Sequence, residues 1–200
     1  DGDGNDNGTC YTNGWEPNNI RFSWAVTNQY VNVNPVPAQL TVAGGVPSSM
    51  AVLVDSSDLT NAMWTSYSAN PSVSLGTTQG WHDVWIGLRG LSASSQQTWQ
   101  WKRLKLDTVP PSLVITNPVS TNGSIPMMQL QGYCPEALRS LRCDLTNALG
   151  LVTNLSAFVL DQHYDTNTWE FTTNYFQCFD VDLTNGVNKI TLHATDMAGN

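Results

Sequence analysis

The sequence predicts an all-β protein composed of two β-sandwich domains in tandem. Three observations support this prediction. Thr, Ser, Asn, Val and Leu are abundant, whereas Lys and Glu, the usual residues of helix surfaces, occur only three times each. Short segments of alternating polar and apolar residues are separated by turn signals throughout the chain. Two consecutive prolines, Pro110 and Pro111, interrupt this pattern near the middle of 200 residues, which is a suitable length for two domains of about 100.

The alternating segments define the expected strands in order. Before the prolines, we expect strands at 20–26, 30–36, 39–42, 50–54, 72–75, 81–88 and 98–106. After them, we expect strands at 112–115, 127–132, 141–145, 157–160, 168–172, 175–183 and 188–194. Only residues 135–141 have a weak helical pattern, and we expect at most one helical turn there. Short strands at this spacing are typical of β-sandwiches.

The domain boundaries follow from the two prolines, which lack backbone donors and hold the chain extended. We expect an acidic segment over 1–19, a first sandwich over 20–107, a linker over 108–111 and a second sandwich over 112–200. The chain carries a formal net charge of −8, which disfavours nucleic acid as a partner. No apolar run is long enough to cross a membrane, and the chain does not begin with Met, so we expect a mature protein or an excerpt of a longer one.

The second half resembles the bacterial immunoglobulin-like (Ig-like) domains that recur in large surface proteins, RHS-type secreted proteins and adhesins. The resemblance rests on Pro110–Pro118 (PPSLVITNP), on Leu130-Gln131-Gly132 and on the ending Gly186–Asn200 (GVNKITLHATDMAGN). It covers about 109–200, with a weaker echo in 20–107. It implies two Ig-like sandwiches that serve as spacers, stalks or binding units.

The resemblance also implies that the second sandwich lacks its last strand. In the first half, the segment 81–88 is followed by 98–107, whereas nothing follows the equivalent segment 188–194 except Thr195–Asn200. Two explanations remain open at this stage. Either the sequence is truncated, or another subunit donates the strand, for example through residues 20–36, which would produce a filament.

The acidic N-terminus contains oxygen ligands at the spacing of a calcium-binding loop. Asp1, Asp3, Asn5 and Asn7 are the candidate metal ligands, with glycines between them for sharp turns. The bidentate Glu of such a loop is missing, because Gly14 occupies its position. The alternative is a solvated terminal segment rich in Asp, Asn and Gly. Calcium is the only cofactor that the sequence suggests.

Eight tryptophans in 200 residues are unusual, and three of them share one predicted sheet face. Strand alternation places Val84, Ile86 and Leu88 toward the core. It places the candidate binding face outside, and this face comprises Trp85, Arg89, Trp99, Trp101 and Arg103. Stacked guanidinium and indole groups favour a structural ladder. A docking face for a neighbouring domain and a platform for sugar rings are the alternatives.

Four cysteines, Cys10, Cys134, Cys143 and Cys178, favour disulfides in an oxidising compartment and lack metal-ligand spacing. Cys143 and Cys178 are the predicted pair, because they lie on two strands, whereas Cys134 precedes a proline. A Cys134–Cys143 pair is the competing prediction.

The sequence contains no recognisable catalytic motif, and its three histidines are scattered. We therefore expect a protein without enzymatic activity. The expected role is that of an extracellular structural module of a bacterial surface protein, stalk or filament that contacts other subunits or neighbouring domains. The alternative is a carbohydrate-binding or adhesive module that uses the tryptophan-rich face, with a glycan as its partner.

Overall fold

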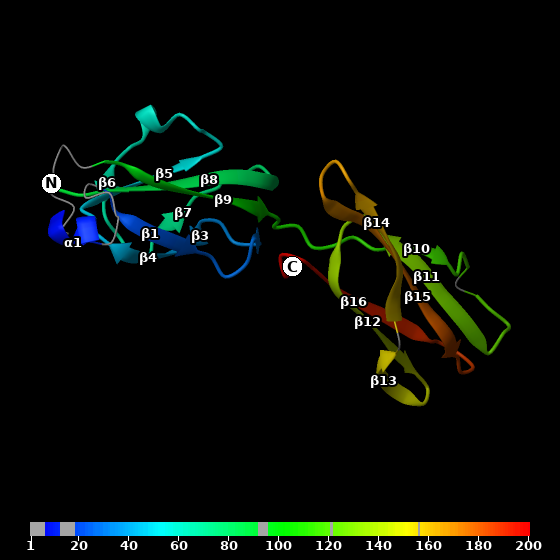
Figure 1. Ribbon diagram of the computed structural model, residues 1–200. Coiled ribbons are helices and arrows are strands. Elements are labelled where there is room, and N and C mark those ends of the chain that lie inside the picture. The colour runs from blue at the N-terminus through cyan, green and yellow to red at the C-terminus, as the bar shows by residue number, and fades with distance from the viewer. Residues whose placement is uncertain (1–6, 13–18, 92–95, 121, 156) are drawn as a thin grey trace. The chain divides into compact units, whose positions relative to one another are not determined.

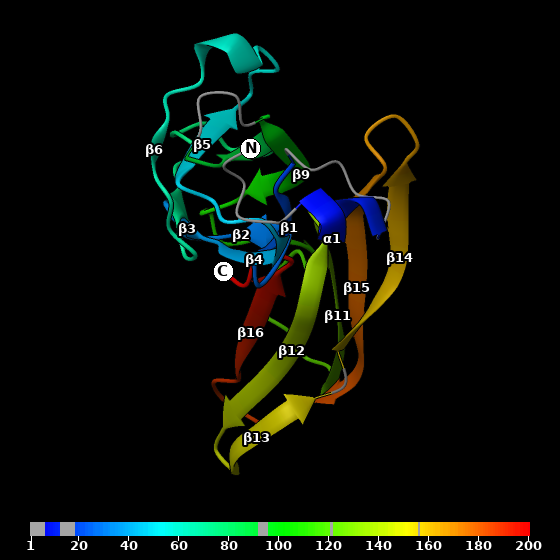
Figure 2. The same ribbon diagram turned by 60° about the vertical axis from the view of Figure 1, so that its left-hand side comes forward.

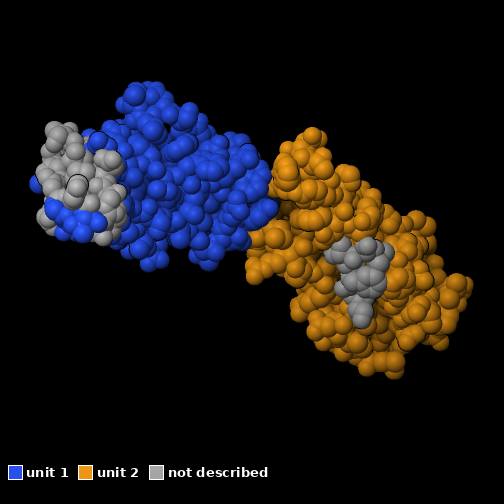
Figure 3. All heavy atoms as spheres, in the orientation of Figure 1, with its two compact units in different colours: residues 1–108 blue, residues 109–200 orange. Residues whose placement is uncertain are grey.

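The computed structural model describes residues 7–12, 19–91, 96–120, 122–155 and 157–200, which form a nearly all-β protein (Figure 1). The predicted fold class is thereby confirmed. The chain divides into two compact units, residues 1–108 and 109–200, which Figure 3 colours separately. This division falls inside the segment 108–111 that was expected to be a linker.

The described helices are short. They are α1 (Asn7–Thr12) and the 3₁₀ turn η1 (Leu59–Asn61), which begins where the Asp58 carboxylate accepts the backbone N–H of Thr60. Neither helix is long and apolar enough to cross a membrane.

The first unit contains a five-stranded sheet. Its strands in spatial order are β2 (Tyr30–Val31), β9 (Thr98–Leu106), β8 (Gly80–Arg89), β5 (Ser49–Val54) and β6 (Thr65–Ser66). Neighbouring strands are antiparallel except for β2, which runs parallel to β9. Strands β8 and β9 form an antiparallel hairpin, and Trp85 lies opposite Trp101 in its register.

Two smaller sheets complete the first unit. They are β1 (Arg21–Ala25) with β4 (Gln39–Gly44), and β3 (Val36–Pro37) with β7 (Ser72–Val73). Phe22 and Trp24 of β1 join Ile86 of β8 and Leu104 of β9 in one buried cluster. The small sheets therefore pack against one face of the large sheet, because each strand directs every second side chain toward the core.

The second unit is a sandwich of two antiparallel sheets (Figure 2). One sheet contains, in order, β10 (Val114–Asn117), β11 (Met127–Cys134), β15 (Glu170–Asp182) and β14 (Ala157–Asp165). The other contains β13 (Gly150–Leu155), β12 (Leu138–Asn147) and β16 (Lys189–Asp196). Leu130 and Val181 of the first sheet share a buried cluster with Cys143 and Leu145 of the second.

Residues 135–141, where at most one helical turn was expected, contain none. Strand β12 begins at Leu138, which is buried and pairs with Asp196 of β16. Pairing with β16 and burial of Leu138 outweigh the weak local helical preference. Strand β13 was not predicted, because its residues are exposed along almost its whole length and therefore lack the alternation of a half-buried strand.

Candidate functional site

The outer face of strands β8 and β9 is lined by aromatic and charged side chains. Val84, Ile86 and Leu88 are fully buried on the inner face. The odd-numbered residues of β8 therefore lie on the opposite face, next to their partners on β9. We call this outer surface the tryptophan face, and it comprises Trp81, Asp83, Trp85, Arg89, Trp99, Trp101, Arg103 and Lys105.

The centre of the tryptophan face is a cross-strand pair. The rings of Trp85 and Trp101 are tilted against each other, with their centroids 6.3 Å apart. The indole N–H of Trp101 donates to the Asp83 carboxylate at 3.3 Å, and the Arg103 Nε lies 3.6 Å from the same oxygen. Asp83 therefore links an indole to a guanidinium group on the neighbouring strand.

At one end of the face, Trp99 lies against Gly87. A Cβ atom at residue 87 would lie 2.7 Å from the indole, so only glycine admits this contact. The ring of Trp99 meets Trp64 edge-on at 5.5 Å, and the Arg89 guanidinium lies 4.4 Å from the Trp64 ring. Arg89 thus stacks on Trp64, a residue that strand alternation could not identify because it precedes β6 and lies outside the hairpin.

At the other end, Trp81 is the shared partner of two cations. Arg103 lies 5.3 Å and Lys105 5.9 Å from its ring, and Tyr30 of β2 packs beside it at 5.6 Å. The sequence-based interpretation omitted Trp81, although its odd number on β8 places it on the same face as Trp85. These contacts make the face an internally paired cation–π ladder.

A groove of about 430 Å³ borders the ladder along β9. Trp101, which is 50% exposed, lines it together with Lys102 and Arg103. Its opposite wall comes from Ala25, the last residue of β1, and from Val26 and Gln29, which lie between β1 and β2. Because β2 pairs only with Lys105 and Leu106, the rest of this side of β9 has no neighbouring strand among the described residues.

His82 is the buried polar residue of the hairpin. Its Nδ1 lies 2.6 Å from the Asp55 carboxylate and its Nε2 lies 2.8 Å from the Thr78 carbonyl oxygen. Both partners are acceptors, so the doubly protonated ring, which donates from both nitrogens, suits this environment best. Burial opposes the charge, but the hydrogen bonds to Asp55 and Thr78 outweigh it and raise the pKa of His82.

Stability of the first unit is expected to fall as pH rises above neutrality. Because the folded-state pKa of His82 lies above its unfolded value of about 6.5, the imidazolium contributes fully below that pH and its contribution is lost as pH rises through the folded pKa. The loss should be about 1 kcal/mol, since water screens the half-exposed Asp55. Urea unfolding followed by tryptophan fluorescence between about pH 5.5 and 8.5 measures it.

The matched control for this titration is His82→Gln, which carries no charge at any pH. Its unfolding free energy should be nearly flat over the same range. A wild-type profile parallel to that of His82→Gln would contradict the assignment. At acid pH the sign reverses, because the hydrogen bonds from His82 and from the Asp83 backbone outweigh partial burial and lower the pKa of Asp55, so that its contribution is lost as pH falls through that value.

His193 lies on the outer face of β16, where its Nε2 is 3.0 Å from the Asp144 carboxylate of β12. In the described part of the chain, neither His82 nor His193 has a hydroxyl or thiol side chain as a hydrogen-bond partner. The arrangement of a histidine-activated nucleophile is therefore not formed around these two rings.

The outer edge of β16 is the second candidate site. Strand β16 pairs with β12 on one side, just as β8 pairs with β5. Short edge strands, β13 and β6, continue the two sheets in the same order. The far side of β8 is covered by β9, whereas no strand within the described residues covers the far side of β16.

A groove of about 600 Å³ lies beside the uncovered edge of β16. Residues 192–195 of β16 line it together with Pro111 and Leu113, which precede β10. The groove also extends to Ser140 and Arg142 of β12, on the paired side of β16. In the first unit, β9 lies between β8 and β2. Part of the groove of the second unit likewise lies between β16 and the segment before β10. An extended segment in this groove would complete the sheet as β9 does in the first unit.

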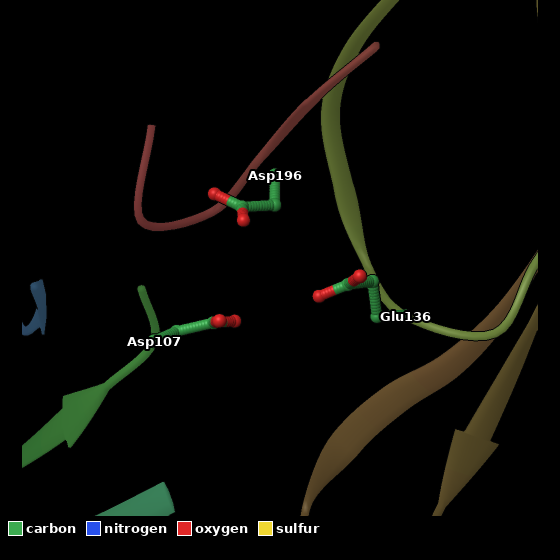
Figure 4. Close-up of side chains that lie close together, drawn as sticks. All are labelled: Asp107, Glu136 and Asp196. Atoms are coloured by element: carbon green, nitrogen blue, oxygen red, sulfur yellow. The ribbon is translucent and has the colours of Figure 1, made fainter. Parts of the chain in front are cut away.

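The predicted metal ligands are not brought together by the described structure. Asp1, Asp3 and Asn5 lie outside the described residues, and Asn7 is the first residue of α1. Figure 4 instead draws Glu136 and Asp196 of the second unit, whose carboxylate oxygens lie within 4.8 Å of each other, and Asp107 of the first unit.

Asp196 anchors the turn that follows β16. One carboxylate oxygen accepts the backbone N–H groups of Gly199 and Asn200, and the other accepts the Asn200 side-chain amide at 2.9 Å. These hydrogen bonds satisfy both oxygens of the buried carboxylate without a bound ion. They also give a structural role to the Asp-Met-Ala-Gly-Asn ending on which the resemblance to Ig-like domains partly rests.

The three described cysteines, Cys134, Cys143 and Cys178, are buried free thiols. The predicted disulfide between Cys143 and Cys178 is therefore not formed in this structure. Cys10 lies in α1, in the segment before the first unit's strands.

Comparisons with protein-family models and with curated proteins found no match to this chain. The resemblance of its second half to bacterial Ig-like domains therefore stays a prediction. The functional conclusion rests on the geometry of the two units.

Proposed function

We propose that this chain is an extracellular structural module of a bacterial surface protein, stalk or filament, without enzymatic activity, which acts through protein–protein contacts. The observation that carries the proposal is the uncovered edge of β16 with its adjacent groove. An unpaired strand edge exposes backbone donors and acceptors, and an extended segment from another chain or domain can satisfy them. Calcium binding by the N-terminal segment remains a prediction within this proposal.

The first unit supports an expectation about the partner segment. Strand β9 covers the edge of β8 and contributes Leu104 and Leu106 to the buried core. The partner segment for β16 should likewise be an extended strand with apolar side chains at alternate positions. Residues 20–36 are unsuited as a donor strand, because Ile20, Phe22 and Trp24 are buried in the core of their own unit.

A second copy of the chain is the simplest probe of this edge. We expect wild-type protein to self-associate as its concentration rises, as measured by analytical ultracentrifugation, with increasing hydrogen-exchange protection of the β16 amides. Leu113→Lys places a charge in the groove and should weaken association by about tenfold or more, because the charge must be desolvated when a strand docks.

The matched control is Leu151→Lys on β13, at the opposite edge of the same sheet. Leu151 is already exposed and lies outside the groove, so this variant should associate like the wild type. A wild-type chain that stays monomeric at its highest soluble concentration, with unprotected β16 amides, would contradict strand addition between copies.

A carbohydrate-binding or adhesive role is the second candidate, and one observation favours it. Trp101 presents half of its surface to solvent beside the groove that also contains Lys102 and Arg103. An exposed indole offers an apolar face for a sugar ring, and the two cations favour a sugar that carries an acidic group. Most other indoles of the face are already stacked on Arg, Lys or aromatic partners, which is why the structural role is preferred.

A further inference from the structure

Two cysteine side chains meet between the sheets of the second unit. Cys143 is on β12 and Cys178 is on β15, which belong to opposite sheets. Their exposed fractions are 0% and 1%, and both belong to the same buried cluster, together with Leu130, Leu145 and Val181. Each thiol shifts the pKa of the other, so the two side chains lie close together across the core.

The third described thiol is not part of this contact. Cys134 is also buried, but it ends β11, where it pairs with Asn174, and its thiol interacts with the backbone of Glu136. It is not a member of the cluster that contains the other two cysteines. The competing Cys134–Cys143 pair is therefore disfavoured by the fold, although it is the shorter loop in the sequence.

We propose that Cys143 and Cys178 are an oxidation site, and that their disulfide joins the two sheets while the second unit folds rather than after it has folded. The adjacent thiols determine which cysteines react. The complete burial of both sulfur atoms determines when they react, because a disulfide reagent reaches them only before the sheets close.

The interaction between the two thiols shifts their pKa values in opposite directions. The hydrogen bond to Cys178 and burial both raise the pKa of Cys143 in the folded unit. The same hydrogen bond lowers the pKa of Cys178, so it is the burial of both side chains, and not their ionisation, that keeps a disulfide reagent from the folded pair. In the unfolded chain both thiols are exposed, and the pKa of each is about 8.5.

The oxidant in this reaction is a disulfide, either a small molecule such as oxidised glutathione or a protein disulfide. One cysteine thiolate attacks a sulfur of the reagent, forms a mixed disulfide and releases one reagent thiol. The second cysteine then attacks its neighbour's sulfur, forms the Cys143–Cys178 bond and releases the second reagent thiol. The two cysteines are oxidised, the reagent disulfide is reduced to two thiols, and the two cysteine protons end on those thiols.

The test compares two treatments of the full chain. In one, reduced and denatured protein is refolded in a mixture of reduced and oxidised glutathione; in the other, native reduced protein is incubated in the same mixture for the same time. Free thiols are then alkylated, and peptide mapping identifies the linked cysteines. We expect the Cys143–Cys178 link after refolding, and two alkylated thiols at these positions after native incubation.

The bond should also stabilise the second unit, because it restricts the unfolded chain over a loop of moderate length. Removing the bond with reductant should lower the melting temperature of that unit by on the order of 10 °C. The comparison uses the wild-type protein in both redox states, so it does not depend on whether a cysteine variant folds. Cys134→Val should keep both the link and the reductant effect, whereas Cys143→Val should lose both.

Three outcomes would overturn the proposal. Alkylation of both Cys143 and Cys178 after oxidative refolding would show that no disulfide forms at this site. A link from either of them to Cys134 would show that the pairing is different. Equal formation of the link in native and refolded protein would contradict the inferred order of folding and oxidation.

Discussion

Phe176→Ala is expected to unfold the second unit and leave the first unit folded. Phe176 is almost completely buried on β15, and its ring lies against Gly132 of β11. Truncation of a buried phenylalanine costs roughly 3–5 kcal/mol, because apolar contacts are lost and a cavity remains. This is a large part of the stability of a domain of this size.

The tryptophans make this prediction straightforward to measure. Seven of the eight precede residue 102, and only Trp169 lies in the second unit, where it is exposed. Fluorescence therefore reports on the first unit, while calorimetry detects both. In Phe176→Ala we expect the fluorescence transition to be unchanged. The calorimetric transition of the second unit should disappear or shift to a much lower temperature. Loss of both transitions together would show that the units do not fold independently.

Ile86→Ala and Trp101→Ala should differ sharply, although both change the β8–β9 hairpin. Ile86 is fully buried on the inner face, so its truncation should lower the unfolding free energy of the first unit by about 4 kcal/mol. Trp101 is half exposed on the outer face, so its truncation should lower the unfolding free energy by about 1 kcal/mol, mainly because the contact with Trp85 is lost. Urea unfolding monitored by circular dichroism measures both values.

The order of these two effects tests the register of the hairpin. A shift by one residue would exchange the faces and make Trp101 the more costly truncation. The Trp101→Ala protein also distinguishes the two candidate functions. Binding to an acidic-glycan array that disappears in Trp101→Ala and persists in Trp169→Ala would favour the carbohydrate-binding role over the structural one.

The sequence by itself determined the fold class and the inner and outer faces of the longest strands. In β8, apolar residues occur at every second position from Val84 to Leu88. This is the period at which side chains of an extended strand face the same side, so the residues of β8 and β9 that face the core can be read from the sequence. Local pattern was sufficient because each of these strands has one buried and one exposed face. It failed for β13 and for the start of β12, where exposure at an edge or pairing with a distant strand decided the conformation.

Only the tertiary structure decided which side chains meet. Trp64 stacks with Arg89, the Asp55 carboxylate lies against the His82 ring, and Cys143 shares a buried cluster with Cys178. The members of each pair are more than twenty residues apart in the sequence. Strand period specifies a face but not the neighbour on another strand or the opposite sheet. The groove beside β16 likewise became visible only from the comparison of two sheets, because it depends on the order of strands in space.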